Sequence, residues 1–160
     1  METENRRYIV FEPIGGYEVS INDEINVKKQ NALVREITLA LKDTMKEHDY
    51  LYLCANQIGY NNRIFVIKFG EEYKTFINPM ITKVQNITMQ YETCNSIPGK
   101  TFVRPRHQSI FATYQTPLGD IESKQFLGMA AIIFSVSGCK KGLNPTTSTF
   151  VYFDTVVTLT

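Results

Sequence analysis

The sequence predicts an α+β protein in which one amphipathic helix is followed by a series of strands. Two observations carry this prediction. Apolar residues recur at helical spacing over residues 31–48, and after residue 50 they fall mainly in short runs or alternate with polar residues. Because helices do not alternate regularly with these strands, the pattern favours antiparallel pairing over repeated βαβ units.

The predicted N-terminal helix occupies residues 31–48. Charged residues fill the positions between its apolar ones, so one face can pack against a sheet while the other remains in solvent. The residues on the packing face are Val34, Ile37, Leu41, Met45 and His48.

Two apolar runs after this helix predict strands, "RIFVIKFG" at residues 63–70 and "KTFINPMITKV" at residues 74–84. Pro79 interrupts the second run, and proline cannot donate a hydrogen bond to a neighbouring strand. We therefore expect this strand to be bent at Pro79 or to lie at the edge of a sheet.

The C-terminal part contains three further segments. Residues 107–127 alternate apolar and polar side chains around a Pro-Leu-Gly-Asp turn, which predicts a β-hairpin. Residues 129–137, "MAAIIFSVS", fit either a buried helix or a buried strand. Residues 148–160 have the composition of another strand.

The composition restricts the class of protein. A chain of 160 residues suits a single domain, residues 1–160. With 17 basic and 16 acidic side chains its formal charge is +1, which argues against a specific nucleic-acid surface. Its three cysteines form no disulfide framework, and no apolar run approaches the roughly 18 residues of a membrane span. We expect a cytoplasmic protein that does not enter a membrane.

Two motifs make the chain similar to the peptide deformylase family. That family's first motif, Gly-x-Gly-Leu-Ala-Ala-x-Gln-Ile-Gly, is matched at Leu53, Ala55, Gln57, Ile58 and Gly59. Its second, Glu-Gly-Cys-Leu-Ser with a following Pro-Gly turn and an Arg-Pro pair, is matched at Glu92, Cys94, Ser96, Pro98, Gly99, Arg104 and Pro105. The resemblance extends over about residues 20–128, and residues 129–160 diverge.

The resemblance implies antiparallel β-sheets packed around a central helix, with the N-terminal amphipathic helix outside. It also implies a hydrolase that removes the formyl group from N-formyl-methionyl nascent peptides. In the family an Fe²⁺ or Zn²⁺ ion is held by one Cys and by two His of a His-Glu-x-x-His helix, where the Glu transfers the protons.

By position, the resemblance assigns roles to residues of this chain. Cys94 would be the thiolate ligand, and the Gln57 side chain and the Asn95 backbone N–H would stabilise the oxyanion. The substrate would contact Leu53, Ile58, Gly59 and Ile97.

The family's third motif, His-Glu-x-x-His, is absent. A gapless alignment places its His, Glu and second His on Ser135, Val136 and Cys139, and an alignment shifted by two places them on Ile133, Phe134 and Ser137. Neither set contains an imidazole or a general base, and loss of a general base alone typically lowers rates by roughly 10²–10⁴. We expect no bound metal and weak or absent hydrolysis. The alternative function is a non-catalytic module that binds peptides in the retained cleft.

Several interpretations of the degenerate site stay open. Cys94 is either a buried thiol beside a turn or part of a zinc site formed by Cys54, Cys94 and Cys139, with Cys139 the weaker candidate. His107 reads as an ordinary strand histidine. The basic residues at 104–106 and 140–141 are solvated charges or a contact to ribosomal RNA. The end of the chain reflects a natural pseudoenzyme, a rebuilt site or a frameshifted segment.

Overall fold

The computed structural model describes residues 23–94 and 97–137, which form two α-helices, a 3₁₀ turn and one antiparallel sheet of five strands. This confirms the predicted α+β class. The elements are α1 (Asn31–His48), β1 (Tyr52–Cys54), η1 (Ala55–Ile58), β2 (Ile64–Phe69), β3 (Glu72–Cys94), β4 (Ile97–Gln115), β5 (Ile121–Leu127) and α2 (Met129–Ser137). The strand predicted at residues 148–160 lies outside the described residues.

Helix α1 has the bounds that its periodicity predicts. Its buried face packs on the sheet and includes Val34, Ile37, Leu41 and Met45, whereas His48, also predicted on that face, is exposed. Asp49 ends the helix in the left-handed conformation (φ 58°) and donates its backbone N–H to the carbonyl of Met45. Lys46 and His48 lie in the last turn, where cations interact favourably with the helix dipole. This arrangement fixes α1 across one face of the sheet.

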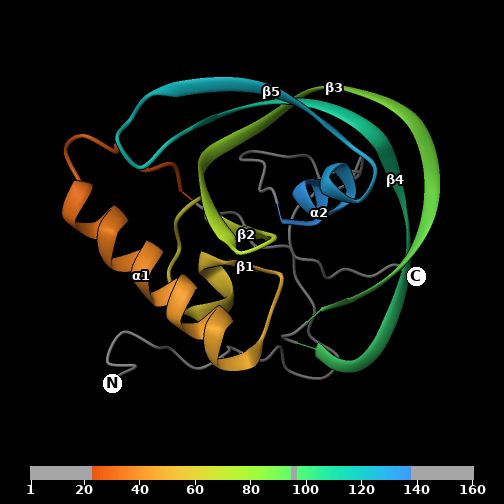
Figure 1. The fold of residues 1–160 in the computed structure, drawn as a ribbon, viewed down its shortest axis with the longest axis horizontal. Helices are drawn as coiled ribbons and strands as arrows, with labels where there is room; N and C mark the ends of the chain where they lie inside the picture. The colour runs from red at the N-terminus through yellow and green to blue at the C-terminus, as the bar shows by residue number, and fades with distance from the viewer. Residues whose placement is uncertain (1–22, 95–96, 138–160) are drawn as a thin grey trace.

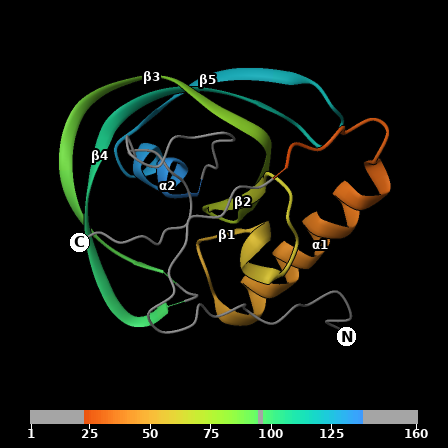
Figure 2. The same ribbon diagram turned by 180° about the vertical axis from the view of Figure 1, so that it is seen from behind.

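The sheet has the order β1-β2-β3-β4-β5, and every neighbouring pair is antiparallel. Figures 1 and 2 show β3, β4 and β5 curving together around α2, while α1 lies outside this curl beside β1 and β2. The expected sheets around a central helix are therefore one strongly curved sheet around α2. Neither described helix combines the length and apolarity needed to cross a membrane.

Strand β3 is 23 residues long and continues through Pro79. The predicted bend is present, because the pairing with β4 shifts register between Ile77 and Met80 and Asn78 has φ 50°. The edge position is present as well, because β3 pairs with β2 only up to Ile77 and, among the described strands, only with β4 beyond it. Pro79 is tolerated there because the pairing with β2 ends at Ile77, so its missing N–H breaks no bond to that strand.

The predicted hairpin at residues 107–127 is confirmed by the pairing of β4 with β5. Its turn is closed by a hydrogen bond from the Thr116 N–H to the Asp120 carbonyl (2.9 Å), and Gly119 supplies the positive φ of 94° that the turn needs. Residues 129–137, which fit helix or strand, form helix α2.

Two apolar clusters cover the two faces of β2. Val66 packs in the cluster that contains α1, whereas its neighbours Phe65 and Ile67 pack in the cluster that contains α2. Burial on both faces explains why this strand is a continuous apolar run. The second cluster is rich in aromatic rings and centres on Phe65, Phe76, Tyr114, Phe126 and Phe134.

Candidate functional site

The first family motif forms a compact turn at β1 and η1. The Cys54 backbone N–H donates to Oε1 of Gln57 (3.0 Å). In return, the Gln57 backbone N–H is directed at the Cys54 side chain. Gly59 ends the turn with φ 95°, which L-residues with a side chain rarely adopt. The motif therefore specifies a local structure in which Gln57 is held by the strand before it.

This arrangement fixes the orientation of the Gln57 amide. Its carbonyl oxygen accepts from the backbone of Cys54, and the NH₂ group on the same carbon can only donate. A donor held in this way could stabilise negative charge on a carbonyl oxygen, the role that the resemblance to the family implies for Gln57.

Leu53 and Ile58, predicted as substrate contacts, are buried in the cluster that also holds α1. Leu53 is fully buried and Ile58 is only 4% exposed, so contacts from this stretch would come mainly from its backbone. Cys54, the third thiol considered for a zinc site, is also buried and packs with the aromatic cluster on the α2 side.

Cys94 lies at the end of β3, where it pairs with Ile97 at the start of β4 after a register shift that follows Glu92. The described residues of the second family motif thus lie at one end of the long β3–β4 ribbon. The predicted backbone donor, Asn95, and the candidate ligand Cys139 lie outside the described residues, and their roles stay predictions.

Helix α2 occupies the place in the chain where the family has its histidines. Phe134 is fully buried and packs edge-to-face against Phe65 and Phe76 at centroid distances of 5.1 and 5.2 Å. The Ser135 hydroxyl donates to the carbonyl of Ala131 (2.8 Å), one turn earlier in the same helix. Phe134 therefore packs in the core, and the Ser135 hydroxyl is bonded within its own helix.

Among the residues that the structure describes, the donors that the family's metal needs are not brought together. In the described part of the chain no three His, Cys, Asp or Glu side chains are grouped to hold an ion. His48 stacks on Tyr50 at the end of α1 (5.0 Å between centroids). His107 pairs with Ile87, seven residues along β3 from Cys94. That is roughly 23 Å of strand at about 3.3 Å per residue, whereas two ligands of one zinc ion lie no more than about 4 Å apart.

One buried polar cluster was not singled out from the sequence. The Arg63 guanidinium is 3% exposed, contacts Glu24 (3.3 Å) and donates to the Pro79 carbonyl. Beside it, the Asn78 amide accepts from the Ile25 N–H (3.0 Å) and donates to the Ile25 carbonyl (2.8 Å). These bonds fasten the segment before α1 to the bend of β3. No sequence pattern indicated this role, because the feature that marks it, the positive φ of Asn78, is a property of the folded backbone.

Together these features define an α+β protein whose curved sheet encloses a helix and whose glutamine turn precedes the second strand. A model of the polypeptide deformylase family matches residues 18–136. The chain belongs to this family.

Individual relatives agree with the family match. The peptide deformylase of Syntrophomonas wolfei is 38% identical over 73 residues, 46% of this chain and 48% of that protein. That of Dictyoglomus turgidum is 30% identical over 105 residues, 66% of this chain and 69% of that protein. These matches span about half to two thirds of the relatives. The crystal structure of the Thermotoga maritima peptide deformylase has a TM-score of 0.65 and 25% identity, covering 75% of this chain and 87% of that one.

Proposed function

We propose that this chain retains the family's peptide cleft but hydrolyses N-formyl-methionyl peptides weakly or not at all. One observation carries the proposal. In one alignment the first His position falls on Ser135, which is bonded within its own helix, and in the other the Glu position falls on Phe134, which is packed in the core. The family's reaction, release of formate to leave a free amine, would then be lacking its base and two of its ligands.

The retained part of the cleft suits binding of a peptide end. Strand β1 is the first strand of the sheet, so its outer edge can accept an extended peptide by β-addition. Gln57 would donate from its NH₂ group to the formyl oxygen, and the Asn95 N–H would be the second donor. Methionine-like side chains would lie beside Gln57 and Ile97.

Proton transfer is the weak point of any hydrolysis at this site. Hydrolysis of the bond between the formyl group and the peptide requires an activated water and a group that protonates the leaving amine. Phenylalanine and valine at the aligned positions 134 and 136 can do neither. Since the acid–base group alone is worth roughly 10²–10⁴ in rate, activity would fall at least by that amount. Cys94 alone would hold Fe²⁺ or Zn²⁺ poorly.

The binding partner in this proposal is the N-formyl-methionyl end of a nascent chain in the cytoplasm. Ribosome contact through the basic residues near Arg104 belongs to the same proposal, and its salt dependence would distinguish it from peptide binding.

Calorimetric titration with formyl-Met-Ala-Ser tests the binding half of the proposal, with metal content measured on the same preparation. We expect binding of the formyl peptide, weaker binding of unformylated Met-Ala-Ser, and far less than one metal ion per chain. The Gln57→Leu variant should lose most of the preference for the formyl group. Equal affinity for both peptides would refute the retained cleft, and stoichiometric metal would refute the loss of the site.

A further inference from the structure

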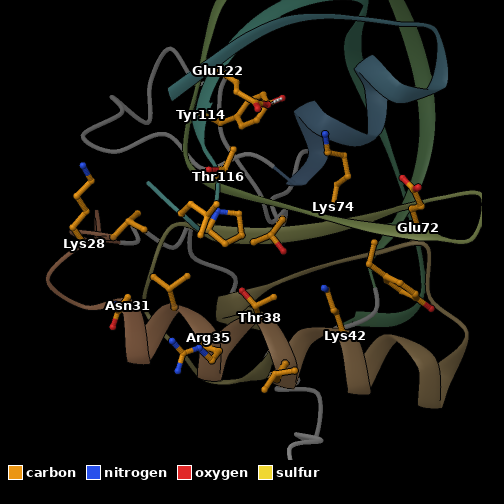
Figure 3. Close-up of a pocket in the computed structure, with 17 residues that line it drawn as sticks. Lys28, Asn31, Arg35, Thr38, Lys42, Glu72, Lys74, Tyr114, Thr116 and Glu122 are labelled. Atoms are coloured by element: carbon orange, nitrogen blue, oxygen red, sulfur yellow. Dashed lines mark hydrogen bonds between the residues drawn. The ribbon is translucent and has the colours of Figure 1, made fainter. Parts of the chain in front are cut away.

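A second candidate site lies away from the family motifs. A groove of about 1010 Å³ separates α1 from the start of β3 and from the turn between β4 and β5 (Figure 3). Its described lining includes no residue of β1, η1 or α2. The groove is therefore lined by other residues than those of the first family motif.

The groove exposes an edge of β3. Strand β2 pairs with β3 over Glu72–Ile77, but the pairing of β3 with β4 begins only at Ile77, opposite Gln115. In the described ranges, no strand therefore lies beside residues 72–76 on the groove side. Backbone N–H and C=O groups of an antiparallel strand point alternately to its two sides, so some of them face the groove. Such an edge can pair with an added extended chain.

The wall opposite this edge is cationic. Arg35 and Lys42 line it from α1, and Lys28 borders the groove just before the helix; Figure 3 shows Glu72, Lys74 and Glu122 on the strand side. The acidic residues of α1 do not line it. Glu122 is already engaged, since it accepts a hydrogen bond from the Tyr114 hydroxyl (2.9 Å).

Lys28 is also held in place. A Cβ built on Gly119, in the turn between β4 and β5, would lie 3.3 Å from Cγ and Cε of Lys28. The lysine stem therefore packs closely over this glycine, at the mouth of the groove. Fixed cations in a cleft concentrate the field and attract acidic ligands.

A buried hydroxyl in the groove lacks a partner. Thr38 lines the groove with 9% of its surface exposed, and its Oγ1 makes no hydrogen bond to any described group. Thr44, farther along α1, bonds instead to the carbonyl of Ala40 (2.7 Å). In Figure 3, Thr38 projects from α1 toward the strands. A buried hydroxyl without a partner is destabilising, and an acceptor supplied by a ligand would remove that penalty.

We propose that this groove binds an acidic peptide in an extended conformation. Its main chain would pair with β3 near Tyr73 and Thr75, its carboxylates would face Arg35 and Lys42, and one of its oxygens would accept the Thr38 hydroxyl. A peptide fits better than a nucleic acid, because apolar side chains also line the groove and a strand edge can pair with a peptide main chain. Those apolar residues are Val27, Val34, Leu39 and Leu118.

Fluorescence anisotropy with a fluorescein-labelled (Glu-Val)₄ peptide tests the proposal on the full chain. We expect it to bind more tightly than a labelled (Lys-Val)₄ peptide or an eight-nucleotide uridine RNA, with affinity that falls as salt rises. Arg35→Glu combined with Lys42→Glu should weaken binding about tenfold or more. Lys83→Glu with Lys124→Glu makes the same charge change at exposed sites outside the groove, and should change affinity less than about twofold.

Thr38→Val tests the buried hydroxyl separately. The variant should weaken (Glu-Val)₄ binding about fivefold, the loss of one hydrogen bond, while its Tm equals or exceeds that of the parent chain. A hydroxyl with no role in binding would leave the affinity unchanged. The proposal would be overturned by that result, by equal affinities of the two double variants, or by tighter binding of the RNA than of the acidic peptide.

Discussion

The β1–η1 turn and helix α2 differ in how many of the family's motif residues they contain. In the turn, Gln57 keeps both its identity and a local anchor, the N–H of Cys54 (3.0 Å). In α2 the chain forms a helix where the family's third motif aligns, but the first His position falls on Ser135 in one alignment and the Glu position falls on Phe134 in the other.

This difference shows that packing and chemistry can separate. Helix α2 is held by aromatic contacts of Phe134 to both β2 and β3, which do not depend on a metal. The turn is held by hydrogen bonds of the same residues that would contact a substrate. Loss of the third motif therefore leaves the enclosing sheet intact, whereas loss of Gln57 would disturb both structure and binding.

The largest expected effect is in α2. Phe134→Ala should lower the free energy of unfolding by about 3–5 kcal/mol, because it leaves a cavity among fully buried rings. Urea denaturation measures this loss. Met129→Ala, at an exposed position of the same helix, is the matched control and should change stability by less than about 0.5 kcal/mol. Similar values for the two variants would show that α2 is not part of the core.

High pH should weaken the same cluster through Tyr114. Burial, with a smaller contribution from the hydrogen bond to Glu122, raises the pKa of Tyr114 from 10.0 to about 12. The folded state keeps this proton when the unfolded state has lost it, so the stabilisation is complete below pH 10 and is lost as pH rises to 12. Unfolding free energy should fall by roughly 2–3 kcal/mol over this range. Tyr114→Phe should flatten the profile, and an unchanged slope in that variant would contradict the assignment.

A smaller effect is expected in the turn. Gln57→Leu removes the acceptor of the Cys54 N–H and should lower stability by about 1–2 kcal/mol in urea denaturation. Gln57→Glu keeps an acceptor at the same place, so it should keep most of the stability that Gln57→Leu loses. If both variants were as stable as the parent chain, the turn would not depend on this side chain.

The smallest effect separates a structural serine from a functional one. Among the described groups, the Ser135 hydroxyl bonds the carbonyl of Ala131 in its own helix, and alanine has the higher helix propensity. Ser135→Ala should therefore change stability by no more than about 0.5 kcal/mol and leave formyl-peptide affinity unchanged. A clear loss of affinity would place Ser135 in the binding site.

Local patterns predicted much of the fold. The bounds of α1, the strand at residues 64–69 and the hairpin ending at Leu127 all follow from periodicity and turn residues. The helical state of residues 129–137 did not, because isoleucine and valine suit either state and the contacts of Phe134 with distant strands decide it. The uninterrupted course of β3 through Pro79 also depends on a distant fact, the end of the pairing with β2.

The site was predictable only in its residue types. Motif spacing identified Gln57 and Cys94 and the absence of histidines from α2. The anchoring of Gln57 by Cys54 and the burial of Leu53 arise from how the turn packs on α1 and the sheet. Thr38 gave no signal, because only the three-dimensional contacts reveal that its hydroxyl lacks a partner.

Formate release from formyl-Met-Ala-Ser tests the central claim most directly. The chain, purified under reducing and anaerobic conditions, would be assayed as isolated and after addition of Fe²⁺ or Zn²⁺. With no imidazole or general base in α2, we predict a rate at least about 10² below that of an intact family member in the same assay. Turnover comparable to that enzyme, with one metal ion bound per chain, would contradict the claim.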